Sequence, residues 1–493
     1  MCDYSKDDPS IVWVAAGAGN GGKGTWDEPF SNPGRALQML GPGKTLLFRS
    51  GTYRADLTLQ TSGAPRYPLR IGAWGDDGEV RFVGSSWYFY DVSDVIVSDI
   101  TLEDAPRNAL SIIGRCRRNR FARMRFLNYG TTGKTSCAVF FGGPNAQCNI
   151  VENSLFSRRI PAPEAEGKDV EHVSVGLMIS EGDWEQGLPN RDHILRNNRF
   201  VNCVYGILVG SHNETTGEYG HVVEENTIEN AVLDGIHAKC GDTIIRRNTI
   251  RHCGRNSVAL HAGKGSLVAD NRIVGGKTGI EIRGSAHTVQ GNCIIDCRRE
   301  AIKVPGPKVP DMAAAINACV ENNTVVASDN GTRGDPTITG LRGERGSSCI
   351  VRKNLFYGTK RPCVFETTGG EITGESRSPE AWLVDDNIVS GTENSCEGFR
   401  RRDVAFADRR GHNYGNDSGY GAGAWVSAPS PAADPSHRQS FGMRDFDTGA
   451  LEEEEARRRH ESAQSLIREV DKEEMLRRSF FFDKSRKNPP PLE

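Results

Sequence analysis

Long apolar runs are missing from this sequence. No stretch of the 493 residues approaches the ~20 apolar residues that a membrane-spanning helix requires, so we expect no membrane span. The first residues, MCDYSKDDPS, also lack the apolar core of a signal peptide, although a signal removed before this point would leave the same start. This end of the chain therefore does not decide the natural compartment.

Motifs for metal clusters and for phosphate binding are missing as well. The 13 cysteines form no C-x-x-C pair, and an odd number cannot all pair within the chain, so most are predicted to be buried thiols. The glycine-rich stretch GAGNGGKGT has no G-K-[ST] at the start of a helix, which argues against a phosphate-binding loop.

The formal net charge of −3 and the pI of about 6.4 give no general attraction to nucleic acid, although a local basic cleft is compatible with them.

Glycine and charged residues are what the sequence does contain. The 56 glycines and a charged fraction of 25% suit many short strands joined by turns better than long helices. A chain of this length is also too long for one ordinary compact core, unless it is built from repeats. The composition therefore makes an all-α fold improbable and directs attention to internal repeats.

A repeat of about 22 residues runs from residue 222 to residue 304. Each unit has an Asn before an apolar residue, then a turn and a short alternating strand. The best-defined copies of this Asn are spaced by 22, 23 and 21 residues, at Asn226, Asn248, Asn271 and Asn292. Weaker copies occur around Asn153, Asn198, Asn323, Asn354 and Asn387.

This period predicts an all-β fold, a right-handed parallel β-helix. Two strands of four or five residues plus turns fit into ~22 residues, whereas a helical-hairpin repeat needs ~33 or more. We interpret the recurring Asn as structural, for two reasons. Asn tolerates left-handed backbone geometry, and its amide can bond to its copies in neighbouring coils.

The segments outside the repeat predict two caps. Residues 1–48 are expected to form an N-terminal cap with a short helix from Pro33 to Leu40 and a first strand, since the end of a solenoid otherwise exposes its core and its strand edges. Residues 49–400 are expected to form the β-helix with its cleft. Residues 401–440 have the composition of an irregular linker, including APSPAADPS.

Residues 441–493 are predicted to be a helical tail. The stretch after Ala450 carries acidic residues first and basic residues later, with no Gly or Pro, as a helix favours. We expect this tail to pack along the solenoid, with the three phenylalanines at 480–482 as its anchors. An interaction tail is the alternative.

The repeat also places polar side chains in lines on the outer surface. Successive coils stack about 4.8 Å apart, and alternate side chains of a strand point outward. The residues expected to point inward are Ile236, Ala238, Val258, Leu260, Ile280, Ile282, Ile302 and Val304. One outward column is then Lys239, His261 and Arg283, and the neighbouring column is His237, Ala259, Glu281 and Lys303. Stacked cations repel, so this arrangement indicates an anionic ligand or compensation by Glu281.

These residue types suit β-elimination of a uronic-acid polymer. That reaction needs a base for the proton α to the carboxylate, a cation to stabilise the resulting charge, and a donor for the departing oxygen. Lys239, His261 and Arg283 can supply these roles. Lys239 can serve as the base if Arg283 and desolvation favour its neutral amine, or His261 can be the base while Lys239 neutralises charge. The alternative is that these columns are an ordinary polar surface of the solenoid, solvated and without a ligand.

Further candidates surround these columns. His237, Glu281 and Lys303 are expected to bind substrate. The segment SHNETTGEYGHV is predicted to be a loop between coils that walls the cleft, with His212 and His221 in it and Tyr219 as a candidate substrate-binding residue or proton donor. A further histidine, His287, sits beside the Asn turn of its coil, so its predicted role is to anchor that turn.

At these residues the chain resembles polysaccharide lyase family 6, which includes chondroitinase B and several alginate lyases. Members carry acidic residues followed by a lysine, then an Arg-His-Gly motif about one coil later, then a G-I-x-I-x-G-x-x-H segment. DGIHAK at 234–239, LHAG at 260–263 and GIEIRGSAH at 279–287 are similar to these three motifs and follow in the same order. The detailed resemblance covers roughly residues 195–305.

The resemblance implies roles for single residues. Lys239 falls on the catalytic base of the family, and His261 falls about where its catalytic arginine stands, allowing one inserted residue. Asp234 falls on one of two acidic calcium ligands, while Val232 stands at the other. The resemblance thus implies a lyase for an anionic polysaccharide such as alginate or a glycosaminoglycan, with calcium as a possible cofactor. It also implies a secreted or periplasmic location.

Three other functions remain open on the sequence. A β-helix glycoside hydrolase uses two carboxylates about 5–9 Å apart, and Asp234 and Glu281, two coils apart, would lie near 10 Å. A uronate C5-epimerase needs the same proton abstraction with reprotonation from the opposite face. A carbohydrate-binding solenoid without catalysis would tolerate loss of Lys239.

Overall fold

The structure is a computed structural model, and it describes most of the first 390 residues. The described residues are 5–75, 78–131, 136–159, 174–180, 182–183, 188–210, 219–307, 313–327, 339–367, 370–373, 382–391, 399–401, 406–408 and 413–416. The predicted helical tail and most of the predicted linker lie outside these ranges, so both stay predictions. Within them, no helix combines the length and the apolar character needed to cross a membrane.

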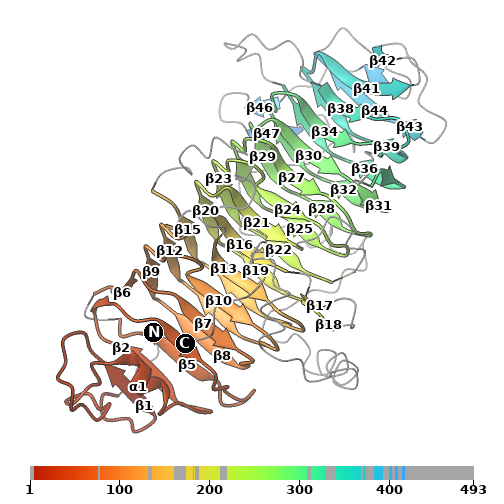
Figure 1. Ribbon diagram of the computed structural model, residues 1–493. Coiled ribbons are helices and arrows are strands. Elements are labelled where there is room, and N and C mark those ends of the chain that lie inside the picture. Colours follow the sequence, from red (N-terminus) through yellow and green to blue (C-terminus); the bar gives the residue numbers. More distant parts are fainter. Residues whose placement is uncertain are drawn as a thin grey trace.

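Three long sheets run along one axis and form the solenoid (Figure 1). Their strands pair in parallel, except that the end strand β42 (Gly370–Thr373) pairs antiparallel with its neighbour. Sheet A has 14 strands among the described residues, in the order β1 (Ile11–Val14), β2 (Thr45–Phe48), β5 (Leu69–Ala73), β8 (Val95–Ser98), β11 (Arg120–Ala122), β14 (Ile150–Glu152), β19 (Ile194–Arg196), β22 (Val222–Glu224), β25 (Ile244–Arg246), β28 (Leu267–Ala269), β32 (Thr288–Gln290), β36 (Ala318–Glu321), β39 (Cys349–Arg352) and β43 (Trp382–Asp385).

Sheet B has 14 described strands, in the order β3 (Gly51–Tyr53), β6 (Val80–Val83), β9 (Thr101–Glu103), β12 (Arg125–Leu127), β15 (Leu155–Ser157), β20 (Arg199–Val201), β23 (Thr227–Glu229), β26 (Thr249–Arg251), β29 (Arg272–Val274), β33 (Cys293–Ile295), β37 (Thr324–Val326), β40 (Leu355–Tyr357), β44 (Asn387–Ser390) and β45 (Phe399–Arg401).

Sheet C, which carries the candidate site, has 13 described strands. They are β4 (Leu57–Leu59), β7 (Trp87–Tyr90), β10 (Leu110–Ile113), β13 (Cys137–Gly142), β16 (Val175–Ile179), β21 (Tyr205–Val209), β24 (Ile236–Ala238), β27 (Asn256–Leu260), β30 (Thr278–Ile282), β34 (Glu300–Val304), β38 (Thr339–Gly343), β41 (Arg361–Thr367) and β42 (Gly370–Thr373). Short two-stranded pairs are β17 (Gly182–Asp183) with β18 (Leu188–Pro189), β31 (Gly284–Ser285) with β35 (Ala315–Ile316), and β46 (Phe406–Asp408) with β47 (Asn413–Asn416).

Each coil contributes one strand to each sheet, so the β-helix prediction is confirmed but the expected two strands per coil is wrong. In one coil, β22, β23 and β24 follow each other and pair in parallel with β25, β26 and β27 of the next. Only Glu225 and Asn226 separate β22 from β23. Because Glu225 has a φ of 57°, the chain turns sharply there and starts a third short strand.

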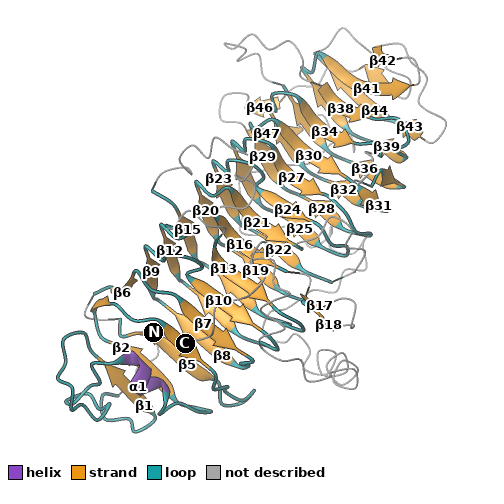
Figure 2. Cartoon of the chain, in the orientation of Figure 1, coloured by secondary structure: helices purple, strands orange, loops and turns teal. Residues whose placement is uncertain are grey.

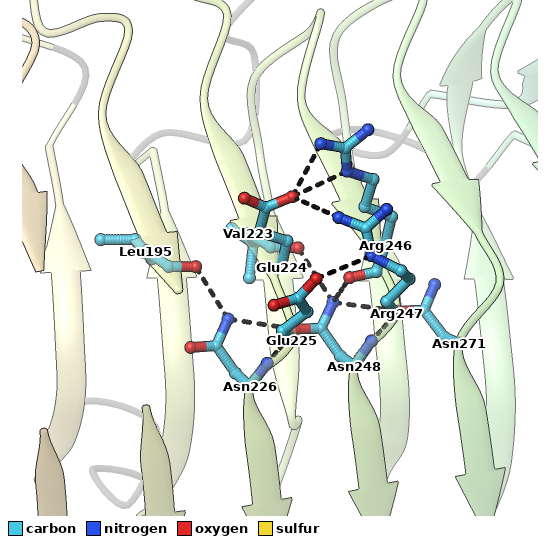
Figure 3. Close-up of polar contacts among 9 residues, drawn as sticks. All are labelled: Leu195, Val223, Glu224, Glu225, Asn226, Arg246, Arg247, Asn248 and Asn271. Atoms are coloured by element: carbon cyan, nitrogen blue, oxygen red, sulfur yellow. Dashed lines mark hydrogen bonds and ion pairs between the residues drawn. The ribbon is translucent and has the colours of Figure 1, made fainter. Parts of the chain in front are cut away.

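The repeating Asn forms a hydrogen-bonded ladder at this turn, as Figure 3 shows. Asn226 Nδ2 donates to Leu195 O at 2.9 Å and to Asn248 Oδ1 at 3.0 Å. Asn248 Nδ2 in turn donates to Asn271 Oδ1 at 2.9 Å. This confirms the predicted bonding between coils.

The other predicted reason, tolerance of a left-handed backbone, holds for Asn153, whose φ is 52° and which precedes the ladder residue Ser154, but it is wrong for the ladder asparagines. The left-handed backbone belongs to the residue before each ladder Asn, such as Arg247 with a φ of 53° and Asp270 with a φ of 56°. Asn is therefore favoured at the ladder position because its amide satisfies buried backbone groups, although Ser154 fills the same place in one coil.

Glu and Arg side chains flank the ladder on the outer side of the turn (Figure 3). Arg246 Nη2 lies 2.8 Å from Glu224 Oε2, and Arg247 bonds to both Glu224 and Glu225 at 3.0 Å. Each pair joins one coil to the next. Because these arginines are partly exposed, we expect each pair to add little stability.

The core fills the space between the three sheets. All eight residues predicted to point inward from sheet C have no exposed surface, which confirms the predicted strand orientation. Sheet B adds aromatic side chains that stack from coil to coil, with ring centroids 4.9 Å apart for Phe126 and Phe156 and 4.4 Å apart for Phe156 and Phe200. Apolar side chains thus stack in columns along the solenoid axis.

The N-terminal helix α1 (Pro33–Leu37) lies at the open end of the solenoid, shown in purple in Figure 2. It is shorter than the predicted span to Leu40. Asn32 caps it by accepting a hydrogen bond from Gly34 N at 2.8 Å, and Pro33 occupies the first turn. Ala36 has no exposed surface and belongs to the main core, so the helix covers the first coil.

Candidate active site on sheet C

The predicted outward columns lie side by side on sheet C. His237, Ala259, Glu281 and Lys303 are consecutive partners in the register of β24, β27, β30 and β34. These strands are neighbours in the green part of Figure 1. The column of Lys239, His261 and Arg283 follows the ends of three of these strands, and each backbone N–H donates to the preceding coil at 2.7 Å.

A buried ion-pair network stands at the start of these strands. Asp234 has no exposed surface, and its carboxylate accepts hydrogen bonds from His237 Nδ1 at 2.6 Å and from Arg255 Nε and Nη2 at 2.9 and 2.7 Å. Asn256 N donates to the same carboxylate at 2.9 Å. Arg255 Nη2 also donates to Tyr205 Oη at 3.1 Å. Burial alone would raise the pKa of Asp234, but the bonds from Arg255 and His237 hold it well below its usual range.

Two imidazoles meet beside this network. The rings of His237 and His261 are in edge contact, with centroids 4.8 Å apart and planes at 72°. His237 Nε2 and His261 Nδ1 are both buried, and neither has a hydrogen-bond partner in the described part of the chain. Burial lowers the pKa of both rings, to about 3 for His261, where His237, Lys239 and Arg283 add to the effect. Both rings are therefore neutral near pH 7.

Arg283 lies deeper than its place in an outward column predicts. Only 1% of its surface is exposed, and its Nε donates to Glu281 Oε1 at 2.9 Å. Its Nη1 donates to the carbonyls of Gly306 and Ala313 at 3.1 and 3.2 Å. Glu281 therefore compensates the charge of Arg283, which is one of the two outcomes that the stacked cations predict. With these donors engaged, the guanidinium acts on neighbours such as His261 through its charge.

The two lysines of the columns differ in their surroundings. Lys303 pairs with Glu344 of the next coil, with Nζ and Oε1 2.9 Å apart. Lys239 is half-buried, and its charge lowers the pKa of both His237 and His261. Lys239 and His261 therefore lie close enough to act on one bound group.

The other candidates are buried or lie outside the described residues. Tyr219 is buried in the main core with 5% of its surface exposed, which does not suit the expected contact with substrate. His287 has no exposed surface, and its Nδ1 accepts from Ser266 N at 3.0 Å, which confirms its structural role. His221 holds a similar turn position, stacked on His193, and does not wall a cleft. His212 lies outside the described residues and stays a prediction.

The residues present do not fit the calcium site that the resemblance implies. Both carboxylate oxygens of Asp234 are engaged by Arg255, His237 and Asn256. The guanidinium of Arg255 already compensates the negative charge that a calcium ion would neutralise. In the described ranges no three acidic, His or Cys side chains gather as metal ligands. Asp234 therefore lacks the free carboxylate oxygens that a calcium ion requires.

Arg255 and Tyr205 were missed by the sequence analysis. Arg255 follows Asp234 by 21 residues, almost one repeat, and precedes the strand β27 that carries the site. One repeat of 22 residues from Asp234 reaches Asn256, so Arg255 lies one position from the place opposite Asp234, and that spacing was the signal that could have found it. No comparable signal marks Tyr205, because its contact spans 50 residues and follows from the stacking of two coils.

The chain matches known right-handed parallel β-helices. A family model described as right handed beta helix region matches residues 187–373, and no curated protein matches. Among solved structures, the PL6 family alginate lyase AlyGC has a TM-score of 0.59 and 14% identity over 85% of this chain and 57% of that lyase. The present chain thus spans little more than half of AlyGC.

Two further structures of the same kind are similar over most of their length. A mannuronic acid specific family 6 lyase from human gut microbiota has a TM-score of 0.53 and 17% identity, covering 75% of this chain and 89% of that one. A PL6 alginate lyase in complex with a trisaccharide has a TM-score of 0.53 and 13% identity, covering 84% and 93%. The fold is therefore a PL6-like right-handed β-helix, as the sequence predicted.

Proposed function

We propose that this protein is a polysaccharide lyase that cleaves a uronic-acid-containing polysaccharide by β-elimination. The observation that carries the proposal is the meeting of Lys239, His261 and the Asp234–His237 pair at the ends of neighbouring strands of sheet C. A cation beside a neutral imidazole matches the two main needs of this reaction, charge stabilisation and proton acceptance.

In the proposed reaction a uronate carboxylate lies against Lys239, and a base removes the C5 proton. The C5–H electron pair becomes the C4–C5 double bond as the C4–O bond breaks, and the departing oxygen takes up a proton. His261 and Lys239 are the two candidate bases. Arg283 is buried and its donors bond to Glu281, Gly306 and Ala313, so it contributes its positive charge without contacting the substrate.

Substrate recognition is proposed to extend along the neighbouring column. His237, Glu281 and Lys303 occupy successive coils there, so a chain of sugars would pass over them. Anionic substrates such as alginate or a glycosaminoglycan suit Lys239 and Lys303. A secreted or periplasmic location accords with such substrates and belongs to the same proposal.

The contacts favour a lyase over a glycoside hydrolase. A hydrolase needs two available carboxyl groups, one of them able to hold a proton. Asp234 is buried, kept ionised and bonded to Arg255, while Glu281 bonds to the buried Arg283. Neither carboxylate is thus free to protonate a leaving oxygen or attack a sugar.

The test is to follow the ultraviolet absorbance of unsaturated uronic products during incubation with alginate, chondroitin, dermatan or heparin. Lys239→Ala should abolish the rise, whereas Lys277→Ala, at an exposed lysine two coils away, should not. New reducing ends without absorbance would point to a hydrolase. Isotope exchange from solvent at C5 without cleavage would point to an epimerase, and binding without any of these changes would point to a non-catalytic solenoid.

A further inference from the structure

The contact between Asp234 and His237 fixes the position of one proton. Asp234 is kept ionised by Arg255 and is therefore only an acceptor. His237 Nδ1 lies 2.6 Å from Asp234 Oδ2, so this nitrogen must carry the hydrogen. In a neutral imidazole the other nitrogen, Nε2, then holds a lone pair.

The lone pair of His237 faces a buried environment. His237 is 4% exposed, and its Nε2 has no hydrogen-bond partner in the described ranges. The Nδ1 of His261 is buried and equally without a partner there. An unpaired buried nitrogen is unfavourable. The described contacts include no bond between these two nitrogens, but the rings touch with their centroids 4.8 Å apart, so a small reorientation of either ring would close an N–H···N bond between them. The two unsatisfied nitrogens thus complement each other.

We propose that Asp234, His237 and His261 form a tautomer relay that makes His261 the base. His237 Nε2 accepts a hydrogen bond from His261 Nδ1–H, so His261 presents the lone pair of its own Nε2 to the cleft. His237 is then a positioning residue and His261 the catalytic residue, with Lys239 left to neutralise the substrate carboxylate. The chemical role rests on the proposed lyase function, whereas the two tautomers do not.

The surroundings of His261 keep its ring neutral in the free protein. Lys239, Arg283 and the neighbouring His237 all disfavour a positive charge on the ring, and only Asp234 opposes them. A bound uronate adds a negative charge at Lys239 and so favours protonation of His261 when substrate is present. The free enzyme thus keeps the base neutral, and the substrate makes it a better acceptor.

The proton balance of the step closes within the same residue. His261 Nε2 takes the C5 proton and becomes an imidazolium, while the C5–H electrons form the double bond and expel the glycosidic oxygen. The imidazolium then returns its Nε2 proton to that oxygen. The ring ends in the Nδ1–H tautomer from which it started, ready for the next cycle.

The test is ¹⁵N NMR of the full chain labelled at histidine, recorded near neutral pH without substrate. Signals are assigned with His237→Gln and His261→Gln. His287→Asn is the matched control, because Asn119 and Asn149 occupy in earlier coils the turn position that His287 occupies in its own. The relay predicts protonated Nδ1 and unprotonated Nε2 on both rings. It also predicts that His237→Gln shifts His261 toward the other tautomer, whereas His287→Asn does not.

The outcomes separate the relay from the proposed function. An Nε2–H tautomer on either ring of the wild-type protein would overturn the relay, even if the protein cleaves polyuronates and even if the variants fail to fold. Unchanged His261 signals in a folded His237→Gln protein would overturn it as well. Both tautomers as predicted, with no activity on any polyuronate, would support the relay and refute the lyase.

Discussion

Arg255 Nη2 donates to Asp234 Oδ2 at 2.7 Å, and this contact joins two successive coils of the solenoid. The guanidinium compensates the charge of a carboxylate that has no exposed surface. Through Asp234 it also acts on His237, whose Nδ1 bonds to the same oxygen. One ion pair between coils therefore sets the electrostatics of the candidate site.

Removing this cation should destabilise the protein strongly. In Arg255→Met the buried carboxylate of Asp234 loses two hydrogen bonds and its compensating charge. We expect a loss of roughly 2–4 kcal/mol in the free energy of unfolding, measured by urea denaturation. Arg247→Met is the control, because Arg247 pairs with Glu224 at the surface and should cost about 0–1 kcal/mol. Equal losses in the two variants would contradict this view of Arg255.

The Asn ladder should be sensitive to removal of a single amide. Asn248 bonds to Val223 O, Arg246 O and Asn271 Oδ1, and its own Oδ1 accepts from Asn226. Asn248→Ala leaves several buried groups unpaired, so we expect a loss of roughly 2–4 kcal/mol in chemical denaturation.

The exposed Asn230 provides the control for the ladder. Its φ is 56°, a conformation that glycine adopts freely, so Asn230→Gly removes an amide outside the ladder without backbone strain. This variant should change stability by less than about 1 kcal/mol. A small effect of Asn248→Ala would show that the ladder contributes little.

Arg283 should prove structural as well as electrostatic. Arg283→Met leaves Glu281 without its bonded cation and two backbone carbonyls without a donor, so we expect a loss of roughly 3–5 kcal/mol in unfolding free energy.

Lys303→Ala, which breaks a half-buried pair with Glu344, should remain folded and raise KM for the polysaccharide. The comparison uses thermal unfolding for both and kinetics for Lys303→Ala. A stable Arg283→Met protein would place this guanidinium at the substrate instead.

Stability should decrease on mild acidification. Burial lowers the pKa of several histidines below the value of 6.5, to about 3 for His221 and His261 and about 4 for His287. The unfolded chain binds these protons first, so stability is lost as pH falls from about 6.5 toward those lower values, and the loss then levels off. The slope is about 1.4 kcal/mol per pH unit for each such histidine.

The pH prediction is checked by urea midpoints between pH 7 and pH 4. The control is His287→Asn, which removes one of the titrating rings and should flatten the dependence. A midpoint that rises on acidification, or an unchanged slope in the variant, would contradict the prediction. The loss should begin before the carboxylates titrate, because their ordinary pKa values lie lower.

The sequence by itself determined the fold and the register of the outward columns. The spacing of Asn226, Asn248 and Asn271 revealed the coil length, because each coil must return to the same turn. Apolar residues at alternate positions of each strand then indicated which side chains face out. The same pattern predicted that Glu281 and Lys303 are register partners on neighbouring strands. Local periodicity is sufficient here because a solenoid repeats one local structure.

Only the tertiary structure decided what each polar residue does. Arg283 was expected in an outward column but is buried and bonded to the carbonyls of Gly306 and Ala313, and Asp234, a predicted calcium ligand, is bonded by Arg255. The tautomer of His237 likewise depends on which neighbour reaches its Nδ1. These outcomes depend on side-chain burial and on contacts between coils, whose energies are set by desolvation and geometry in three dimensions. A sequence column fixes which residues are neighbours, but it does not fix which of them donate, accept or stay exposed.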